Sequence, residues 1–149
     1  MRDQNTLFRE LDAEMQRDVG FILLTLLVVD GDEVFRVYSS HPESFPLGGR
    51  KSMGSTPWGE LVIKNKQNFL ARDKDRLRWA FYDHATTEGL GGGSQINIPV
   101  VKCDKCIGTI NLTDREHAYT ETHVRKAEKY APRLVEAFAE IQRSTRPER

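Results

Sequence analysis

Apolar positions change their spacing from segment to segment, and this spacing predicts the secondary structure. Over residues 3–18 they recur every three or four positions, which predicts an amphipathic helix: Leu7, Phe8, Leu11 and Met15. The segment 21–29 is almost continuously apolar and has no polar face. We therefore predict a strand there that is covered on both sides.

A hairpin follows the apolar strand. The turn Asp30-Gly31-Asp32 leads into a second predicted strand over residues 34–40. Successive side chains of a strand point to opposite faces, so we expect Arg36 and Tyr38 to share one face of it.

The middle of the chain is irregular. Residues 41–56 carry Pro and Gly without periodicity, which predicts a long loop. Thr56 followed by Pro57 predicts the N-cap and first position of a short helix. A short strand over 68–70 and a helix over 73–82 complete this region.

The last third of the chain reads as two strands and a helix. Strands are predicted over 94–102 and 107–113, joined by a tight turn, and Thr120 caps a helix running to about Arg143. We expect one domain over residues 1–143 and a polar tail over 144–149. An antiparallel sheet would carry the terminal helices on one face and the long loop with the short helices on the other, leaving a ligand cavity under the loop.

Charge and composition narrow the function classes. Lys and Arg number 22 and Asp and Glu number 22, so the net charge is zero. This argues against a general phosphate-backbone binder and against a polybasic membrane-surface protein. The apolar run is too short to span a bilayer, no signal peptide is read, and two cysteines make no disulfide framework. We expect a cytoplasmic protein that contacts neither nucleic acid nor membrane.

Several motifs, taken in their order along the chain, resemble one family. They are the segments 36–42, 45–51 and 81–84, Trp58, Asn97-Ile98-Pro99-Val100, Gly108-Thr109-Ile110-Asn111-Leu112 and Tyr119-Thr120. Together they resemble GAF domains, sensor modules related to PAS domains. The resemblance implies a GAF-like α+β fold with an antiparallel sheet, a small-molecule cavity, and a homodimer formed through the terminal helices. It names no ligand, so the cofactor stays unknown, and we expect a stand-alone domain.

A polar patch is predicted on the two late strands. Asn97 alternates away from its apolar neighbours together with Gln95, as do Thr109 and Asn111 on the next strand. Amides that both donate and accept hydrogen bonds can recognise a polar ligand. The alternative is that both Asn side chains tie down the long loop, since buried polar groups need partners.

Basic residues beside the glycine-containing loop are candidates for binding an anionic group. Arg36, Arg50 and Lys51, with Tyr38 nearby, would meet a carboxylate or phosphate on the ligand. The alternatives are a surface ion pair for Arg36 and solvent exposure for Lys51.

Aromatic residues are predicted to line or plug the cavity. Trp58 and Phe81 are the candidates, with plain core packing as the alternative. Asp83 either contacts the ligand or caps the next turn.

The two cysteines define the competing hypothesis. Cys103 and Cys106 are separated by two residues at a hairpin tip, where they would form a reducible pair or half of a zinc site, or remain inert thiols. Some GAF proteins reduce free methionine-R-sulfoxide with cysteines that line the pocket, but here the cysteines are predicted to lie away from it. We therefore expect a non-catalytic sensor with no metal, and keep a thiol redox protein as the alternative.

Overall fold

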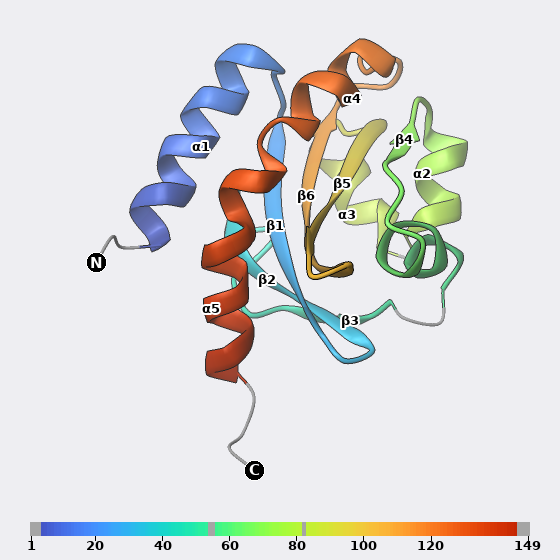
Figure 1. Ribbon diagram of the computed structural model, residues 1–149. Coiled ribbons are helices and arrows are strands. Elements are labelled where there is room, and N and C mark those ends of the chain that lie inside the picture. Colours follow the sequence, from blue (N-terminus) through green and yellow to red (C-terminus); the bar gives the residue numbers. More distant parts are fainter. Residues whose placement is uncertain (1–3, 54–55, 82, 146–149) are drawn as a thin grey trace.

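A six-stranded antiparallel sheet organises the chain (Figure 1). The computed structural model describes residues 4–53, 56–81 and 83–145. The strands lie in the order β3-β2-β1-β6-β5-β4, and their bounds are β1 (Leu23–Asp30), β2 (Glu33–Ser39), β3 (Arg50–Ser52), β4 (Phe69–Ala71), β5 (Ser94–Lys102) and β6 (Lys105–Asp114). The predicted α+β fold with an antiparallel sheet is confirmed.

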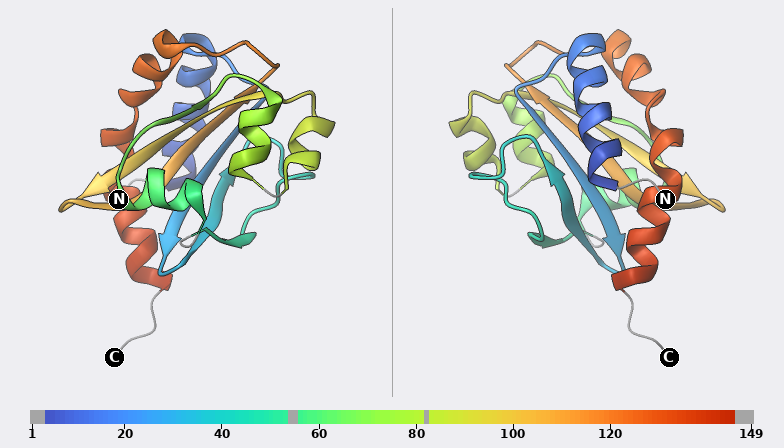
Figure 2. Two further views of the ribbon diagram at one scale, coloured as in Figure 1. Left: turned by 90° about the vertical axis from the view of Figure 1, so that its right-hand side faces the viewer. Right: turned by 90° about the vertical axis from the view of Figure 1, so that its left-hand side faces the viewer.

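Helices cover both faces of this sheet (Figure 2). One face carries the first helix and the last ones, namely α1 (Gln4–Asp18), α4 (Glu121–Glu128), the 3-10 helix η2 (Ala131–Leu134) and α5 (Val135–Thr145). The other face carries the π-helix η1 (Gly59–Lys64), α2 (Lys74–Ala80) and α3 (His84–Gly89). No helix in the described part of the chain is long and apolar enough to cross a membrane.

Strand β1 contributes to a hydrophobic core on each face. Leu24 and Leu26 belong to the cluster under α1 and α5, whereas Leu27 and Val29 belong to the cluster under η1 and α2. An apolar run without a polar face is therefore a strand covered on both sides, as predicted.

Strand β2 contains a bulge that changes which side chains share a face. Leu26 pairs with Tyr38 and Leu27 pairs with Arg36, so Val37 is an extra residue between them. A bulge restarts the alternation of side chains. The prediction that Arg36 and Tyr38 share one face is wrong for this reason.

The final helix is interrupted near its middle. The predicted helix to Arg143 is instead α4, then η2, then α5, which ends at Thr145. Pro132 lies in the break, where it has no N–H to donate to the carbonyl of Glu128 in a continuous helix. Residues 146–149 of the predicted tail lie outside the described residues.

The terminal helices share one face of the sheet, as predicted, and contact each other there. Arg133 pairs with both carboxylate oxygens of Glu14, and Tyr130 donates a hydrogen bond to Asp18. The rings of Phe8 and Phe138 meet edge to face, with centroids 6.2 Å apart. These contacts fix the helical layer against one face of the sheet and leave the other face for the site.

Candidate functional site

A small cavity lies on the sheet face opposite the terminal helices. Its lining comes from the four strands β2, β1, β6 and β5, from the long loop and β3, and from the end of α2 and α3: Leu23, Thr25, Leu27, Arg36, Phe45, Lys51, Phe81, Asp83, Thr87, Gln95 and Asn111. Its volume is about 30 Å³, room for about two water molecules. Ligand sites usually measure roughly 300–1,000 Å³, so a ligand must displace part of this lining.

Arg36 brings a buried positive charge to the cavity. Only 7% of the residue is exposed, and within the described residues its side chain forms no ion pair with a carboxylate. Nη1 donates a hydrogen bond to the carbonyl of Pro46 at 2.9 Å, while Nε is buried and has no partner among the described residues. Burial lowers the pKa of Arg36, and the nearby carboxylate of Asp83 acts in the opposite direction.

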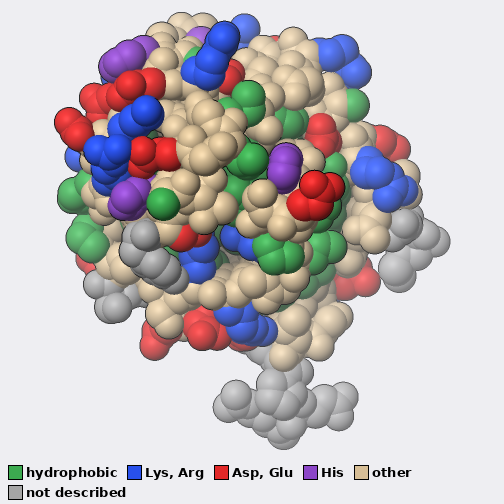
Figure 3. Space-filling model, turned by 180° about the vertical axis from the view of Figure 1, so that it is seen from behind, with side chains coloured by type: hydrophobic (Ala, Val, Ile, Leu, Met, Phe, Trp, Pro, Cys, Tyr) green, Lys and Arg blue, Asp and Glu red, His purple; other side chains and the backbone are tan. Residues whose placement is uncertain are grey.

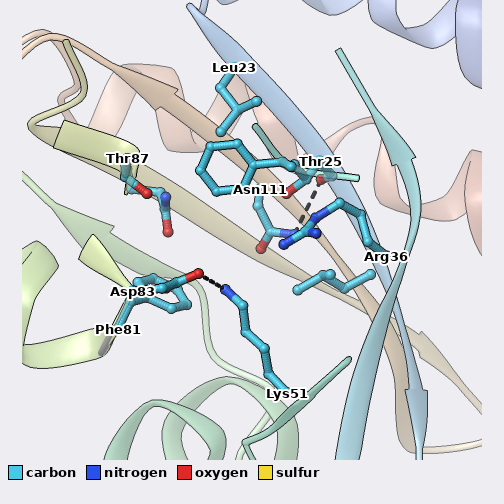
Figure 4. A pocket seen from close by; sticks show the side chains of 11 residues that line it. Leu23, Thr25, Arg36, Lys51, Phe81, Asp83, Thr87 and Asn111 are labelled. Carbon is cyan, nitrogen blue, oxygen red and sulfur yellow. Dashed lines mark hydrogen bonds and ion pairs between the residues drawn. The ribbon is translucent and has the colours of Figure 1, made fainter. Parts of the chain in front are cut away.

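Lys51 and Asp83 form an ion pair at the cavity wall (Figure 4). Nζ of Lys51 lies 2.5 Å from Oδ2 of Asp83, and 16% of the lysine side chain is exposed. Burial lowers the pKa of Lys51, and Asp83 opposes that shift. The Lys51 ammonium also lies 5.5 Å from the centre of the Phe81 ring. Asp83 makes no capping hydrogen bond to α3, so its side chain serves this pair instead.

A network of amide hydrogen bonds lies next to the cavity. Trp58 donates its Nε1–H to Oδ1 of Asn97 at 3.1 Å, and the Asn97 amide donates to Gln95 and Asn111. Because indole Nε1 can only donate, this bond fixes which atom of Asn97 is the oxygen. Asn111 donates in turn to the backbone carbonyl of Thr25. The network joins η1, β5, β6 and β1.

The predicted ligand-binding residues therefore divide into two groups. Five of them line the cavity: Arg36, Lys51, Phe81, Asp83 and Asn111. Trp58, Asn97 and Thr109 are completely buried and do not line it. Asn97 and Thr109 bond neighbouring side chains of the network rather than the long loop.

Tyr38 lies on the other side of the sheet. Its hydroxyl donates to Oδ2 of Asp12 on α1 at 2.5 Å, and its ring meets that of Phe8. Burial raises the pKa of Tyr38, and the hydrogen bond to Asp12 acts in the same direction. The side chain holds α1 to the sheet and is remote from the cavity.

Five lining residues were not singled out as site residues from the sequence: Leu23, Thr25, Leu27, Phe45 and Thr87. Thr25 carried a usable signal, since it is the one polar residue within the apolar run 21–29. Gln95, which the alternation of its strand placed in the polar patch with Asn97, lines the cavity. Phe45 and Thr87 reach the cavity through the folding of the loop and of α3, for which no periodic pattern exists.

The two cysteines differ in solvent exposure. Cys103 is exposed in the turn between β5 and β6, whereas Cys106 is buried and donates its thiol hydrogen to the carbonyl of Gly108. Burial raises the pKa of Cys106 to about 11, which keeps it protonated and weakly nucleophilic near neutral pH. Neither thiol lines the cavity. Among the described residues no cluster of three or more His, Cys, Asp or Glu could hold a metal ion.

A second hollow is larger but has no buried polar side chain in its lining. It is a groove of about 340 Å³ on the helical face, between the outer edge of β5 and η2. It is lined by Lys66, Asn68, Ile98, Pro99, Val101, Glu128, Ala131, Pro132 and Val135. The molecular face in Figure 3 mixes acidic and basic side chains without an extended area of one sign.

Comparison with known proteins identifies relatives of the fold. A family model described as GAF domain matches residues 2–137. The GAF domain of a two-component sensor histidine kinase from Bacillus halodurans is 11% identical, with a TM-score of 0.78 over 98% of this chain and 100% of that one. The GAF domain/HD domain protein from Geobacter sulfurreducens is 10% identical, with a TM-score of 0.75 over 98% and 99%.

An enzyme shares the same fold. The free methionine-R-sulfoxide reductase from Neisseria meningitidis is 19% identical, with a TM-score of 0.63 over 92% of this chain and 78% of that one. No curated protein matches the chain. At these identities the solved structures show the fold alone.

Proposed function

Because the chain belongs to the GAF domain family, we propose that it is a small-molecule sensor whose ligand binds in the cavity between the sheet and the loop that carries Phe45. The observation that carries this proposal is the cavity itself, where buried polar and charged groups from separate elements converge. Concave sites with a few convergent polar groups are where proteins bind small molecules. No catalytic step is proposed.

Two parts of the lining would make room for a ligand. Phe45 reaches the cavity from an irregular loop, and Lys51 closes it only through its ion pair with Asp83. Displacing an irregular loop, or exchanging one ion pair for ligand contacts, disrupts less structure than moving a strand. Access therefore requires no change in the sheet.

Strand β1 would carry the effect of the ligand to the helices. Leu23 and Leu27 line the cavity, while Leu24 and Leu26 pack in the core under α1 and α5. A shift of this strand changes both surfaces at once because close-packed interiors transmit strain.

Alternating methyl groups of β1 provide a direct test. A broad panel of small metabolites would be screened by thermal shift, and each stabilising compound examined by NMR of methyl-labelled protein. We expect binders to move the Leu23 and Leu27 methyl signals first and more strongly than those of Leu24 and Leu26. A panel without binders, or binders that move only the helix-side methyls, would contradict the proposal.

The homodimer through the terminal helices and the cytoplasmic location stay predictions. Sedimentation velocity over a range of protein concentrations measures the first: a single monomer boundary at all concentrations would contradict it.

A further inference from the structure

Arg36 is a buried cation that forms no ion pair with another described residue. More than nine-tenths of the residue is inaccessible, and among the described residues its one side-chain hydrogen bond runs from Nη1 to the Pro46 carbonyl. The Nε atom has no partner there. Burying a charge without an ion partner costs free energy. A bound anion would offset that cost.

The surrounding loop holds the guanidinium in place. The backbone N–H of Gly48 donates to the carbonyl of Arg36 at 2.8 Å, and the N–H of Arg36 donates to the carbonyl of Gly49 at 3.0 Å. A Cβ atom at Gly49 would lie 2.8 Å from Nη1 of Arg36, so a larger residue there would push the group aside. The Arg36 guanidinium carbon also lies 5.3 Å from the centre of the Phe45 ring. The charge is therefore fixed inside the cavity.

The other charges of the cavity cancel. Lys51 and Asp83 form one neutral pair, and the remaining polar lining consists of uncharged hydroxyl and amide side chains. With Arg36 the lining carries one net positive charge. A ligand with one negative charge neutralises it. A neutral ligand leaves the charge uncompensated, and a dianion would need Lys51 to leave Asp83.

The free edge of the guanidinium gives the geometry of the partner. Nη1 is committed to Pro46, so the edge formed by Nε and Nη2 remains. Two parallel N–H donors on one edge match the two oxygens of a carboxylate. Figure 4 shows this guanidinium among the lining side chains, reaching toward Asn111 and Thr25.

We propose that the ligand of this cavity is a small organic monocarboxylate, bound through two hydrogen bonds to the Nε and Nη2 edge of Arg36. The inference rests on the proposed function, because it assumes that the cavity binds a ligand. The carboxylate gives the buried cation the partner that it lacks.

Acetate is the probe for the test, and acetamide is its uncharged control of the same shape. Both would be titrated at constant ionic strength, with NaCl replacing sodium acetate, while the Arg36 Nε–H signal is followed by NMR. That signal is assigned by its loss in Arg36→Gln. We expect acetate to shift it downfield and to raise the melting temperature, with little effect of acetamide or chloride.

Variants separate the guanidinium edge from charge in general. Arg36→Gln should weaken acetate binding about tenfold or more, since it removes charge-assisted hydrogen bonds. Arg36→Lys keeps the charge but lacks the two-donor edge, so it should bind acetate more weakly than the wild type. Arg50→Gln is the matched control: Arg50 is exposed and pairs with Asp30 and Glu33 outside the cavity.

The outcomes distinguish the two proposals. If acetamide or chloride acts as strongly as acetate, or if Arg36→Gln binds acetate unchanged, the carboxylate inference is wrong. If the metabolite screen finds only neutral or cationic binders that move the cavity methyls, the sensor proposal stands and this inference fails. If no compound of any charge binds, the sensor proposal itself fails.

Discussion

Replacing Asn97 by Asp exchanges one amide nitrogen for oxygen at the centre of the buried network. The Asn97 amide donates hydrogen bonds of 3.2 Å to Oε1 of Gln95 and 2.7 Å to Oδ1 of Asn111. An ionised carboxyl at this position would face both acceptors without a proton. Since Asn97 is completely buried, water cannot compensate for the loss.

The variant must therefore fold with its new carboxyl protonated. Keeping an acid neutral costs about 1.4 kcal/mol for each pH unit above its ordinary pKa, or roughly 4 kcal/mol at pH 7. A protonated carboxyl donates to only one of the two acceptors, and the unpaired one costs about 1–3 kcal/mol more. The total at pH 7, about 5–7 kcal/mol, approaches the whole stability of an ordinary domain.

The sign of the pH dependence follows from the proton balance. Above the ordinary pKa of the carboxyl, the folded Asn97→Asp variant holds a proton that the unfolded chain has released. Its stability relative to the wild type therefore falls as pH rises, and near pH 4 only the loss of about 1–3 kcal/mol remains.

Urea unfolding of both proteins from pH 4.5 to 7 measures this difference. The exposed residue Asn65 gives the control, because Asn65→Asp should change stability by less than about 0.5 kcal/mol. An Asn97→Asp effect that stays constant over this pH range would refute the assignment of its amide nitrogen as the donor to Gln95 and Asn111.

Three further predictions follow from single contacts. Gly108→Ala should lower the free energy of unfolding by about 1–3 kcal/mol or more, since its Cβ would lie 2.4 Å from both the Leu27 carbonyl and the Phe138 ring; unchanged urea stability would contradict this close approach. In a thiol titration of the native protein only Cys103 should react, and Cys106 should join it on unfolding; two fast native thiols would contradict its burial. Tyr38→Phe should cost about 0.5–1.5 kcal/mol of stability while leaving acetate affinity unchanged; weaker acetate binding would contradict its place on the helical face.

The fold could be predicted where packing imposes a regular spacing of apolar residues along the chain. The continuous apolar run of β1 marked a strand between two cores, and the alternating β5 and β6 marked a central antiparallel pair. The loop that carries Phe45 has no period, so nothing in its sequence places that ring over Arg36. Its position depends on the folded sheet.

Two local irregularities were not predicted, the break in the last helix and the bulge in β2. Pro132 was present in the sequence, but the apolar stripe around it outweighed the missing N–H, and the helix was predicted to continue. The bulge at Val37 has no comparable marker, because Val suits a regular strand as well as a bulged one. The structure therefore separates two predicted site residues: Arg36 lines the cavity, whereas Tyr38 lies on the helical face.

The bulge in β2 also bears on how this cavity would diverge during evolution. Deleting the single codon for Val37 would remove the bulge and make Arg36 and Tyr38 chain neighbours, so regular alternation would keep Arg36 on the cavity face and Tyr38 on the helical face. The bond between Tyr38 and Asp12 of α1 would therefore survive this deletion. A frame-preserving loss of three nucleotides at Val37 would thus leave ligand chemistry and helix attachment in place, whereas the loss of either neighbouring codon would remove one of the two contacts.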